Sequence, residues 1–266
     1  MVMWRTFGVA AALIVGTPAG AEERRDLCSD RPGLGTPACT VDEGEMVLEV
    51  GIGDWTRDRE GSLRTDTIVA GDALLRVGLS PSLEVQIGWT SVGRVRERDR
   101  ASGTAATRTG VGDVTIALRQ NLRNPDGSGF SVAAMPYVTL PVGGSAIGAG
   151  DWGAGLLLPA SVEVGGVSLG LTPQVAAATD GDGKGRHLAY GATAGGGFGV
   201  TDNVSMALEL AAVRDHDPEG HATELFGGIS AGWQPDENSQ WDVGANIGLN
   251  RNSPDMQIYM GFVQRF

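Results

Sequence analysis

Two short stretches and a set of histidines in this 266-residue chain offer residue types that could do chemistry. The first, Gly148 to Gly153, fits G-x-G-x-x-G, the glycine pattern of a dinucleotide site. Such a site needs its glycines between a strand and a helix, so that the phosphates meet the helix N-terminus. Here the glycines lead into residues that alternate between apolar and polar, which is the pattern of a strand. The sequence therefore indicates a flexible loop and predicts no cofactor.

The second stretch, Asp180 to Gly185, resembles the start of a calcium-binding loop. Lys184 stands where such a loop needs a ligand oxygen, and no Glu occupies the twelfth position. We interpret the stretch as an exposed loop. Cys28 and Cys39 do not change this conclusion, because two ligands without a nearby His or further Cys cannot complete a tetrahedral site. The sequence predicts no metal site.

The third candidate chemistry is nucleophilic catalysis, which requires a base within reach of a nucleophile. The three histidines, His187, His216 and His221, lie in predicted loops or at their edges. None has a Ser two positions later on an outward strand face, which is how some membrane-embedded β-barrels hydrolyse lipid. We therefore predict that the protein has no catalytic residues and is not an enzyme.

A larger set of charged residues alternates with apolar residues along the chain. Its members are Glu49, Asp72, Arg76, Glu84, Asp113, Arg119, Glu163, Glu209, Glu224 and Asp242. Their apolar neighbours form faces suited to lipid, where an Arg or Lys would cost roughly 2–4 kcal/mol near the bilayer midplane. The charges are therefore predicted to point inside and line a pore. Two interpretations stay open: opposite charges pair across the lumen and fill it, or they line a water-filled path and select solutes by charge.

The elements that must position these charges are strands. Apolar residues recur at every second position in twelve segments, such as Met46 to Ile52, Leu83 to Trp89 and Met256 to Phe262. Tight turns alternate with longer, charged stretches at residues 56–66, 94–110, 180–187 and 214–222. This pattern predicts an all-β protein, a transmembrane antiparallel up-and-down β-barrel of about 12 strands, with short periplasmic turns and longer extracellular loops.

Aromatic residues favour a membrane barrel over a soluble sandwich. Those that fall near short turns on the apolar faces are Phe130, Phe198, Trp233, Trp241 and Phe266. Those that fall near long loops are Trp89, Trp152 and Tyr190. Two aromatic bands separated by aliphatic residues fit the two interfaces of a bilayer. A sandwich core would place its large aromatics in the middle of the strands.

The apolar face of the last predicted strand runs to Phe266. Chain ends are usually frayed and hydrophilic, so such a strand must be paired and covered. We expect it to pair with the first strand, which closes the barrel, and to face lipid. A terminal Phe also resembles the signal by which the barrel-assembly machinery recognises outer-membrane proteins. Gln264 departs from that signal, which prefers an apolar or aromatic residue at this position.

The stretch Arg94 to Arg100 concentrates basic residues. If its strand continues without interruption, Arg94 and Arg96 share the inward parity of Glu84. They would then line the outer mouth and attract anions. The alternative is a solvated loop, or one that touches lipopolysaccharide phosphates.

The beginning of the chain predicts export. Arg5, the apolar run Phe7 to Val15 and an A-x-A site ending at Ala21 indicate a signal peptide over residues 1–21. We expect a periplasmic N-terminal segment over residues 22–44 and an outer-membrane barrel over residues 45–266, in a Gram-negative cell. No other stretch approaches the ~20 apolar residues of a spanning helix. The formal net charge of −12 disfavours a nucleic-acid partner.

The N-terminal segment carries both cysteines of the chain, Cys28 and Cys39. In an oxidising compartment, this spacing predicts one short disulfide loop. Farther along the chain, Gly191, Gly195 and Gly197 share the inner face of one predicted strand. Such a bare wall leaves room either for solute or for the N-terminal segment.

Several short pieces of the sequence also suggest a family. They are Asp30-Arg31-Pro32, Pro37, Gly44, Glu49, Gly112-Asp113 and Leu140-Pro141-Val142-Gly143. In these pieces the chain resembles an outer-membrane transporter family named for the meta-pathway of phenol degradation, the Phenol MetA-type β-barrels. The resemblance implies a barrel that passes small solutes, with aromatic or hydrophobic compounds as candidates. It carries over no ligand-binding motif.

Together these observations favour an outer-membrane channel for passive passage of small solutes. Its expected partners are outer-membrane lipid, lipopolysaccharide, the barrel-assembly machinery and the small-molecule solute itself. Two alternatives stay open. One is a structural or adhesive barrel with a plugged lumen, and the other is a lipid-modifying enzyme of the outer membrane.

Overall fold

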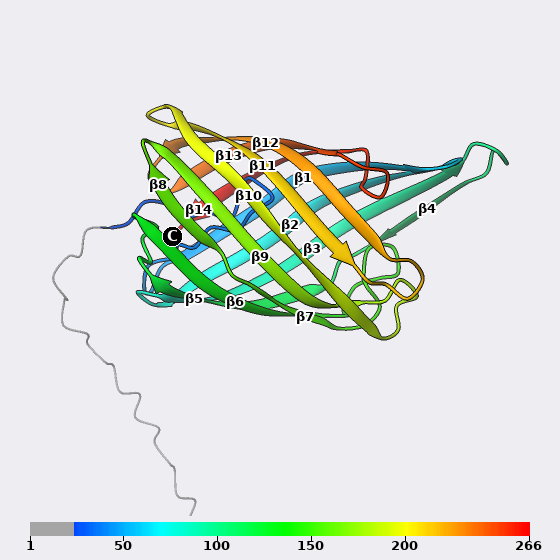
Figure 1. The fold of residues 1–266 in the computed structure, drawn as a ribbon, viewed down its shortest axis with the longest axis horizontal. Coiled ribbons are helices and arrows are strands. Elements are labelled where there is room, and N and C mark those ends of the chain that lie inside the picture. Colours follow the sequence, from blue (N-terminus) through cyan, green and yellow to red (C-terminus); the bar gives the residue numbers. More distant parts are fainter. Residues whose placement is uncertain (1–23) are drawn as a thin grey trace, which may run out of the picture.

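The computed structural model describes residues 24–266 as one curled sheet in which all paired strands are antiparallel (Figure 1). The predicted signal peptide, residues 1–21, lies outside the described residues. Within residues 24–266, the structure has no helix with the length and apolar character needed to cross a membrane. The strands are β1 (Met46–Glu60), β2 (Leu63–Ser80), β3 (Leu83–Asp99), β4 (Ala105–Gly110), β5 (Val114–Arg123), β6 (Phe130–Leu140), β7 (Gly153–Leu157), β8 (Ala160–Val164), β9 (Val167–Thr179), β10 (Arg186–Thr201), β11 (Val204–Asp215), β12 (Ala222–Asp236), β13 (Ser239–Gly248) and β14 (Met256–Arg265).

These strands occupy twelve positions around a closed barrel, which confirms the predicted fold class. Each of two positions is occupied by two consecutive strands. β4 and β5 both pair with β3, and β7 and β8 each pair with both β6 and β9. The break between β7 and β8 falls at Leu158 and Pro159. Proline lacks the N–H that a strand ladder needs, and here the carbonyl of Pro159 still accepts a hydrogen bond from Ala133.

The barrel closes between its first and last strands. β14 pairs with β1 from Arg265, opposite Val47, to Met256, opposite Arg57. At the seam the backbone N–H of Phe266 donates to the carbonyl of Met46 at 2.8 Å. The C-terminus and the start of the described chain lie at the same end of the barrel (Figure 1). The predicted pairing of the last strand with the first is confirmed.

The two faces of the sheet have opposite chemistry. On β14, Ile258 and Met260 are exposed on the outer face, whereas Tyr259 and Val263 are buried on the inner face. Every aromatic residue of the two predicted bands is exposed on the surface: Trp89, Phe130, Trp152, Tyr190, Phe198, Trp233, Trp241 and Phe266. The largest buried side chains, by contrast, are mostly charged or polar. An apolar exterior around a polar interior is the arrangement of a membrane barrel.

Two of the stretches predicted as long loops are mostly strand. β1 and β2 continue through residues 56–66 to a tight turn at Gly61 and Ser62, and β3 and β4 cover most of residues 94–110. The resulting hairpins project beyond the rest of the barrel (Figure 1). Both faces of a projecting hairpin meet water, so its residues need not alternate between apolar and polar. That is why the sequence reads as a charged loop.

The inward parity changes halfway along β1 to β3. In the pairing of β1 with β2, the pair Gly51–Asp72 is followed by the pair Asp54–Val69, three positions farther along each strand. In the pairing of β2 with β3, the pair Asp72–Thr90 is followed by the pair Ala70–Val92. Gly51 and Asp72 nevertheless line the same internal cavity as Asp54 and Val69. Gly71 allows this change because its φ of 65° lies in the left-handed region that glycine adopts without a steric cost.

This change of parity places the basic stretch on the outer surface. Arg94 pairs with Ile68, which is 50% exposed on the outer face, whereas Val95 between Arg94 and Arg96 is only 8% exposed. Both arginines are exposed. The expectation that Arg94 and Arg96 share the inward face of Glu84 is therefore wrong. It assumed an uninterrupted alternation along β3.

The exposed ring of Phe266 supports a prediction about assembly. We expect Phe266→Ala to lower the amount of protein that reaches the outer membrane, with much less effect on the resistance of the assembled barrel to denaturant. One lipid-facing ring contributes only about 1.5–3 kcal/mol of burial, and the terminal aromatic is also the group that the assembly machinery would recognise. Immunoblots of membrane fractions measure the first effect, and urea titrations of the isolated barrel measure the second.

Phe198→Ala is the matched control, because Phe198 is another exposed aromatic near a short turn. It should leave membrane levels close to those of the wild type. Equal membrane levels of both variants and the wild type would contradict a role of Phe266 in recognition.

Candidate functional site in the barrel lumen

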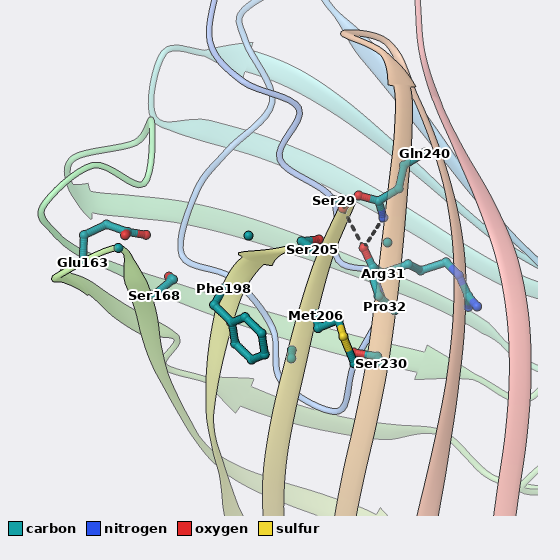
Figure 2. Close-up of a pocket in the computed structure, with 15 residues that line it drawn as sticks. Ser29, Arg31, Pro32, Glu163, Ser168, Phe198, Ser205, Met206, Ser230 and Gln240 are labelled. Carbon is teal, nitrogen blue, oxygen red and sulfur yellow. Dashed lines mark hydrogen bonds between the residues drawn. The ribbon is translucent and has the colours of Figure 1, made fainter. Parts of the chain in front are cut away.

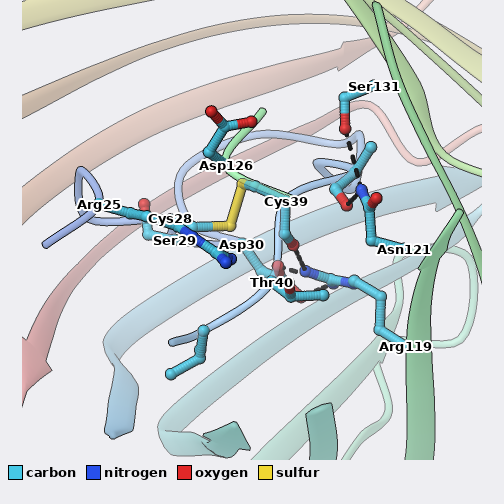
Figure 3. Close-up of a disulfide and its surroundings, with 12 residues drawn as sticks. Arg25, Cys28, Ser29, Asp30, Cys39, Thr40, Arg119, Asn121, Asp126 and Ser131 are labelled. Carbon is cyan, nitrogen blue, oxygen red and sulfur yellow. Dashed lines mark hydrogen bonds and ion pairs between the residues drawn. A yellow bond between two sulfur atoms is a disulfide. The ribbon is translucent and has the colours of Figure 1, made fainter. Parts of the chain in front are cut away.

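Residues 24–44 fold into the barrel and are called the plug segment below. The disulfide Cys28–Cys39, whose Cα atoms lie 6.0 Å apart, closes a loop in this segment (Figure 3). This confirms the predicted disulfide. The N–H of Thr40 donates to the carbonyl of Pro125 in the β5–β6 turn at 3.0 Å. The segment thus occupies the lumen near the short turns, and the structure brings it together with most of the predicted inward charges.

Arg76 on β2 lies at the centre of the contacts between wall and plug segment. Its guanidinium group donates to both oxygens of Glu84 at 2.9 and 3.0 Å and to Oε1 of Glu49 at 3.1 Å. It also donates to the carbonyl of Cys28 at 2.6 Å. Arg76, Glu84 and Glu49 are all almost completely buried. Buried charges are costly unless paired, and here one arginine pairs with two wall carboxylates.

The two carboxylates also bind backbone N–H groups of the plug segment. Glu49 accepts hydrogen bonds from Asp30 N at 2.8 Å and from Arg31 N at 2.9 Å. Glu84 accepts one from Val41 N at 2.6 Å. Hydrogen bonds to charged acceptors are stronger than those between neutral groups. The wall therefore holds the backbone of the segment on both sides of the disulfide.

Arg119 on β5 holds the side chain of Asp30. Its Nη2 atom lies 2.6 and 2.8 Å from the two Asp30 oxygens, and its Nη1 atom donates to the carbonyl of Cys39 at 3.1 Å (Figure 3). Burial disfavours a charged Asp30, but the adjacent guanidinium groups of Arg119 and Arg76 outweigh this effect. The pKa of the Asp30 carboxyl group is therefore lowered from its ordinary value. The lowered pKa favours the charged form of Asp30 in this salt bridge.

Arg31 extends from the plug segment to strand β13 of the wall. Its Nε and Nη2 atoms lie 3.1 and 2.9 Å from the two oxygens of Asp242 on β13. Its guanidinium carbon lies 5.5 Å from the ring centre of Tyr259. A Cβ atom at Gly261 would collide with this guanidinium group. Gly261 on β14 therefore provides the space in which Arg31 reaches Asp242.

A third part of the wall binds the tip of the plug segment. Glu209 on β11 accepts hydrogen bonds from Leu34 N at 2.7 Å and from Gly35 N at 2.8 Å. Gly33 precedes these two residues and has a φ of 129°, a conformation that residues with a side chain rarely adopt. The two N–H groups converge on one carboxylate because of this backbone turn.

The plug segment does not fill the lumen. Between it and strands β8 to β12 lies a cavity of about 380 Å³, which Figure 2 shows with Ser29, Arg31 and Pro32 on one side. A second cavity of about 350 Å³ shares Ser29 and Pro32 with the first. The opposite wall of both cavities includes Gly197. The predicted inner face without large side chains therefore leaves space both for the plug segment and for the cavities beside it.

A third cavity of about 270 Å³ lies on the other side of Arg31, among β1, β2, β3 and β14. It is lined by polar groups that include Asp54, Asp72 and Gln257. Arg31 lines both this cavity and the first one. Arg31, which Asp242 holds in place, thus lies between two polar spaces inside the barrel and is called the partition residue below.

The remaining predicted charges have separate surroundings. Asp72 accepts a hydrogen bond from Thr90 at 2.7 Å inside the third cavity, and Glu163 lines the first cavity. Glu224 lies on the same face of β12 as the buried Ser230, and it is half-buried. Asp113 accepts hydrogen bonds from Gly143 N and Ala149 N, both at 2.7 Å. Asp113 therefore anchors the loop between β6 and β7.

The plug segment contributes the residues that sequence reasoning missed as site residues. Asp30 and Arg31 supply the charges that meet Arg119 and Asp242, and Tyr259 flanks Arg31. A signal for the first two was present, because Asp30-Arg31-Pro32 is among the pieces that resemble the family. The two charges also lie close to a cysteine in a segment with no strand pattern. Nothing in the sequence indicates that Tyr259 contacts them.

The site offers charge and hydrogen bonds, and the space beside the plug segment suits small polar or amphipathic solutes. The buried set has two arginines of the wall facing Glu49, Glu84 and Asp30. Within the described lumen, the first two cavities are lined by no histidine, and their only cysteine, Cys39, is held in the disulfide. This arrangement can bind, orient and exclude solutes.

Solved structures with a similar fold include membrane porins. The NanC porin aligns with a TM-score of 0.50 and 9% identity, over 82% of this chain and 98% of that chain. The KdgM porin aligns with a TM-score of 0.50 and 8% identity, over 84% and 99%. The translocator domain of the autotransporter NalP from Neisseria meningitidis aligns with a TM-score of 0.50 and 13% identity, over 84% and 88%. At these identities the likeness shows the fold.

A comparison with curated protein sequences finds no significant match. A family match covers almost all of the described chain. Residues 29–266 match the family described as "Putative MetA-pathway of phenol degradation", and the matched region contains the disulfide partner Cys39, the inward charges and all the strands. The chain therefore belongs to this β-barrel family, which is the one that its sequence resembles.

Proposed function

We propose that the protein is an outer-membrane channel for passive passage of small solutes. The observation that carries this proposal is the space beside the plug segment, where two adjoining cavities lie against strands β8 to β12. A lumen filled for purely structural reasons would be packed on all sides, because protein interiors are packed as densely as crystals of small molecules. Here the plug segment contacts the wall at separate points and leaves open space between those contacts.

The route that we propose passes Arg31. A solute from one end would enter the first two cavities, and one from the other end would enter the third cavity. The Arg31–Asp242 pair lies between them. Because a twelve-stranded barrel is intermediate between small barrels filled by side chains and wide porins, this route suits solutes of low molecular mass.

The charges along the route favour cations and neutral solutes over anions. Glu163 and Glu209 line the space on one side of Arg31, and Asp54 and Asp72 line the other side. Carboxylates on both sides of a single arginine disfavour large anions. We propose small aromatic or hydrophobic compounds as the substrate class, with their polar groups toward the lining; the family's description as a phenol-degradation pathway supports this choice.

The same proposal places the protein in the outer membrane of a Gram-negative cell, with residues 1–21 removed as a signal peptide. Its exposed apolar belt would contact outer-membrane lipid. Its projecting hairpins would lie outside the cell, where Arg94 and Arg96 are available to lipopolysaccharide phosphates. The barrel-assembly machinery would insert it, and it would work without catalysis.

The partition residue provides the test. In liposomes that contain the purified protein, we expect Arg31→Ala to raise the uptake rate of small neutral and aromatic solutes severalfold, because it removes the side chain that separates the cavities. Solute-swelling assays with sugars, amino acids and phenol derivatives measure the uptake rate. Conductance in planar bilayers should rise in parallel.

Arg59→Ala is the matched control. Arg59 pairs with Asp255 at 2.7 Å, but this pair lies in the half-exposed region of a projecting hairpin. Removing it should leave uptake unchanged. If wild type and Arg31→Ala are both impermeable to ions and to every solute in the panel, the route is closed, and a structural or adhesive barrel explains the molecule better.

A further inference from the structure

A cluster of ionisable side chains at the long-loop end of the barrel lies outside the site described above. It consists of His187 at the start of β10, Asp180 in the β9–β10 loop, and Asp215 and Asp217 around the end of β11. We refer to these four residues as the rim cluster. We infer that the rim cluster is a binding site for a divalent transition metal ion of the Zn²⁺ class, which links the β9–β10 and β11–β12 loops.

The geometry of three donor atoms fits a metal ion. Nδ1 of His187 lies 2.9 Å from Oδ1 of Asp180 and 3.6 Å from Oδ2 of Asp217, and all three residues offer donor atoms within 4.8 Å of one another. Two donors on a tetrahedral metal with bonds of about 2.0–2.2 Å are separated by roughly 3.3 Å. The observed separations lie on either side of this value. Small side-chain shifts would bring both carboxylates onto one ion.

His187 supplies a second, independent observation. Its side chain is only 5% exposed, although it belongs to a charged loop region. Its Nε2 atom lies 2.8 Å from Oδ1 of Asp215 and is buried without a well-aligned hydrogen bond. A carboxylate beside one ring nitrogen, with the other nitrogen directed at the metal, is the usual outer contact of a metal-bound histidine. Asp215 is therefore assigned as the residue that orients the His187 ring.

The loop backbone holds the carboxylates of Asp215 and Asp217 in place without a metal. Oδ2 of Asp217 accepts a hydrogen bond from Gly181 N at 2.6 Å, and Oδ1 of Asp217 accepts one from Glu219 N at 2.7 Å. The N–H of Asp217 donates to Asp215 at 2.7 Å. The donors are therefore pre-positioned by contacts between two different loops, which lowers the ordering cost of binding an ion.

The charge balance also favours a cation. Among the ion pairs of residues 24–266, the three aspartates of the rim cluster contact only His187. One imidazole facing three carboxylates leaves an excess of negative charge. An imidazole donor favours Zn²⁺ and its neighbours among the transition metals over Ca²⁺ and Mg²⁺, which prefer oxygen donors alone. The preference for the Zn²⁺ class follows from His187.

Isothermal titration of the purified, untagged barrel with ZnCl₂, after treatment with a chelator, tests this inference. We expect one equivalent of Zn²⁺ to bind, and CaCl₂ to bind far more weakly. His187→Ala and Asp217→Asn should each weaken Zn²⁺ binding by at least tenfold, the order of loss expected on removing a ligand-shell contact. CoCl₂ provides a spectroscopic check, because bound Co²⁺ should give the visible absorption of a low-coordinate site with one nitrogen donor.

Asp182→Asn is the control from the same loop, since Asp182 is not one of the three candidate metal-ligand residues. His216→Ala and His221→Ala test the other histidines, whose ring centres lie 5.0 Å apart. Binding that survives in His187→Ala, or is lost only with His216 or His221, would overturn the inference. Equal binding of Ca²⁺ and Zn²⁺ would do the same. Channel activity does not enter this experiment, so its outcome is separate from that of the proposed function.

Discussion

Deleting residues 26–42 should raise the single-channel conductance of the barrel severalfold while leaving the barrel itself closed. The deletion removes the disulfide loop together with Arg31, which lines the cavities on both sides of the partition. The barrel should survive because the two buried arginines of the wall keep Glu49 and Glu84 as partners. Arg76 already pairs with Glu84 and Glu49, and Arg119 lies 3.5 Å from Glu84. Water that enters the emptied lumen would solvate them.

Planar-bilayer recordings measure the conductance, and migration of unboiled protein on gels reports whether the barrel is closed. A second variant, Cys28→Ser with Cys39→Ser, keeps the plug segment but removes its covalent link. Because backbone hydrogen bonds to Glu49, Glu84 and Glu209 remain available, this variant should resemble the wild type more closely than the deletion does. A folded deletion variant with wild-type conductance would show that the plug segment does not restrict the lumen.

The second large effect concerns Arg76. We expect Arg76→Met to lower the free energy of unfolding by about 3–5 kcal/mol, the usual cost of removing one partner of a buried ion pair. The substitution leaves Glu49 and Glu84 buried on the wall without their guanidinium partner, and the carbonyl of Cys28 without its donor. Urea-dependent unfolding of the barrel in lipid vesicles, followed by tryptophan fluorescence, measures the change.

Two further variants separate lost charge pairing from lost packing. Arg64→Met removes an arginine that pairs with Asp66 in a partly exposed position on a projecting hairpin, and it should cost less than about 1 kcal/mol. The double variant Arg76→Met with Glu84→Gln should recover part of the stability, because it also removes one of the unpaired carboxylates. A single variant Arg76→Met that unfolds at the same urea concentration as the wild type would refute a stabilising role for this cluster.

The barrel could be predicted from the sequence because lipid imposes a simple rule on each strand. The outer residues of β14, such as Ile258 and Met260, must be apolar wherever lipid covers them, so alternation survives along the strand. The rule holds only where lipid covers the outer face of the strand. Beyond the membrane, β1 to β4 meet water on both faces, so the sequence there resembles a loop although the structure continues as strands.

The change of parity at Gly71 marks another limit. It requires three neighbouring strands to shift their inward faces together, and it coincides with the positive φ of Gly71 and with a register shift between Gly51 and Gly53. In a chain with 42 glycines, a single glycine of this kind cannot be distinguished by its sequence context. The placement of Arg94 and Arg96 depended on this change, which is why charge alternation alone put them on the wrong face.

Most wall residues of the buried charge cluster could be predicted, but the residues of the plug segment that pair with the wall could not. Alternation indicated that Glu49, Arg76, Glu84 and Arg119 face inward. The contact of Arg31 with Asp242 joins residues that are 211 positions apart in the chain. Its existence depends on the path of a segment that has no periodic pattern, so it becomes visible only when the barrel is closed around that segment.

The reach of the plug segment across the barrel has a consequence for the order of assembly. The segment precedes β1 in the chain, yet it depends on Glu209 of β11, Asp242 of β13 and the Arg265 side chain, which donates to the carbonyl of Arg25 at 2.7 Å. The earliest part of the described chain to be synthesised therefore acquires its full set of contacts only when the last strand arrives. Docking of the segment and closure of the seam become one coupled step, so an intermediate that stalls before β14 is in place should leave the segment accessible to periplasmic proteases.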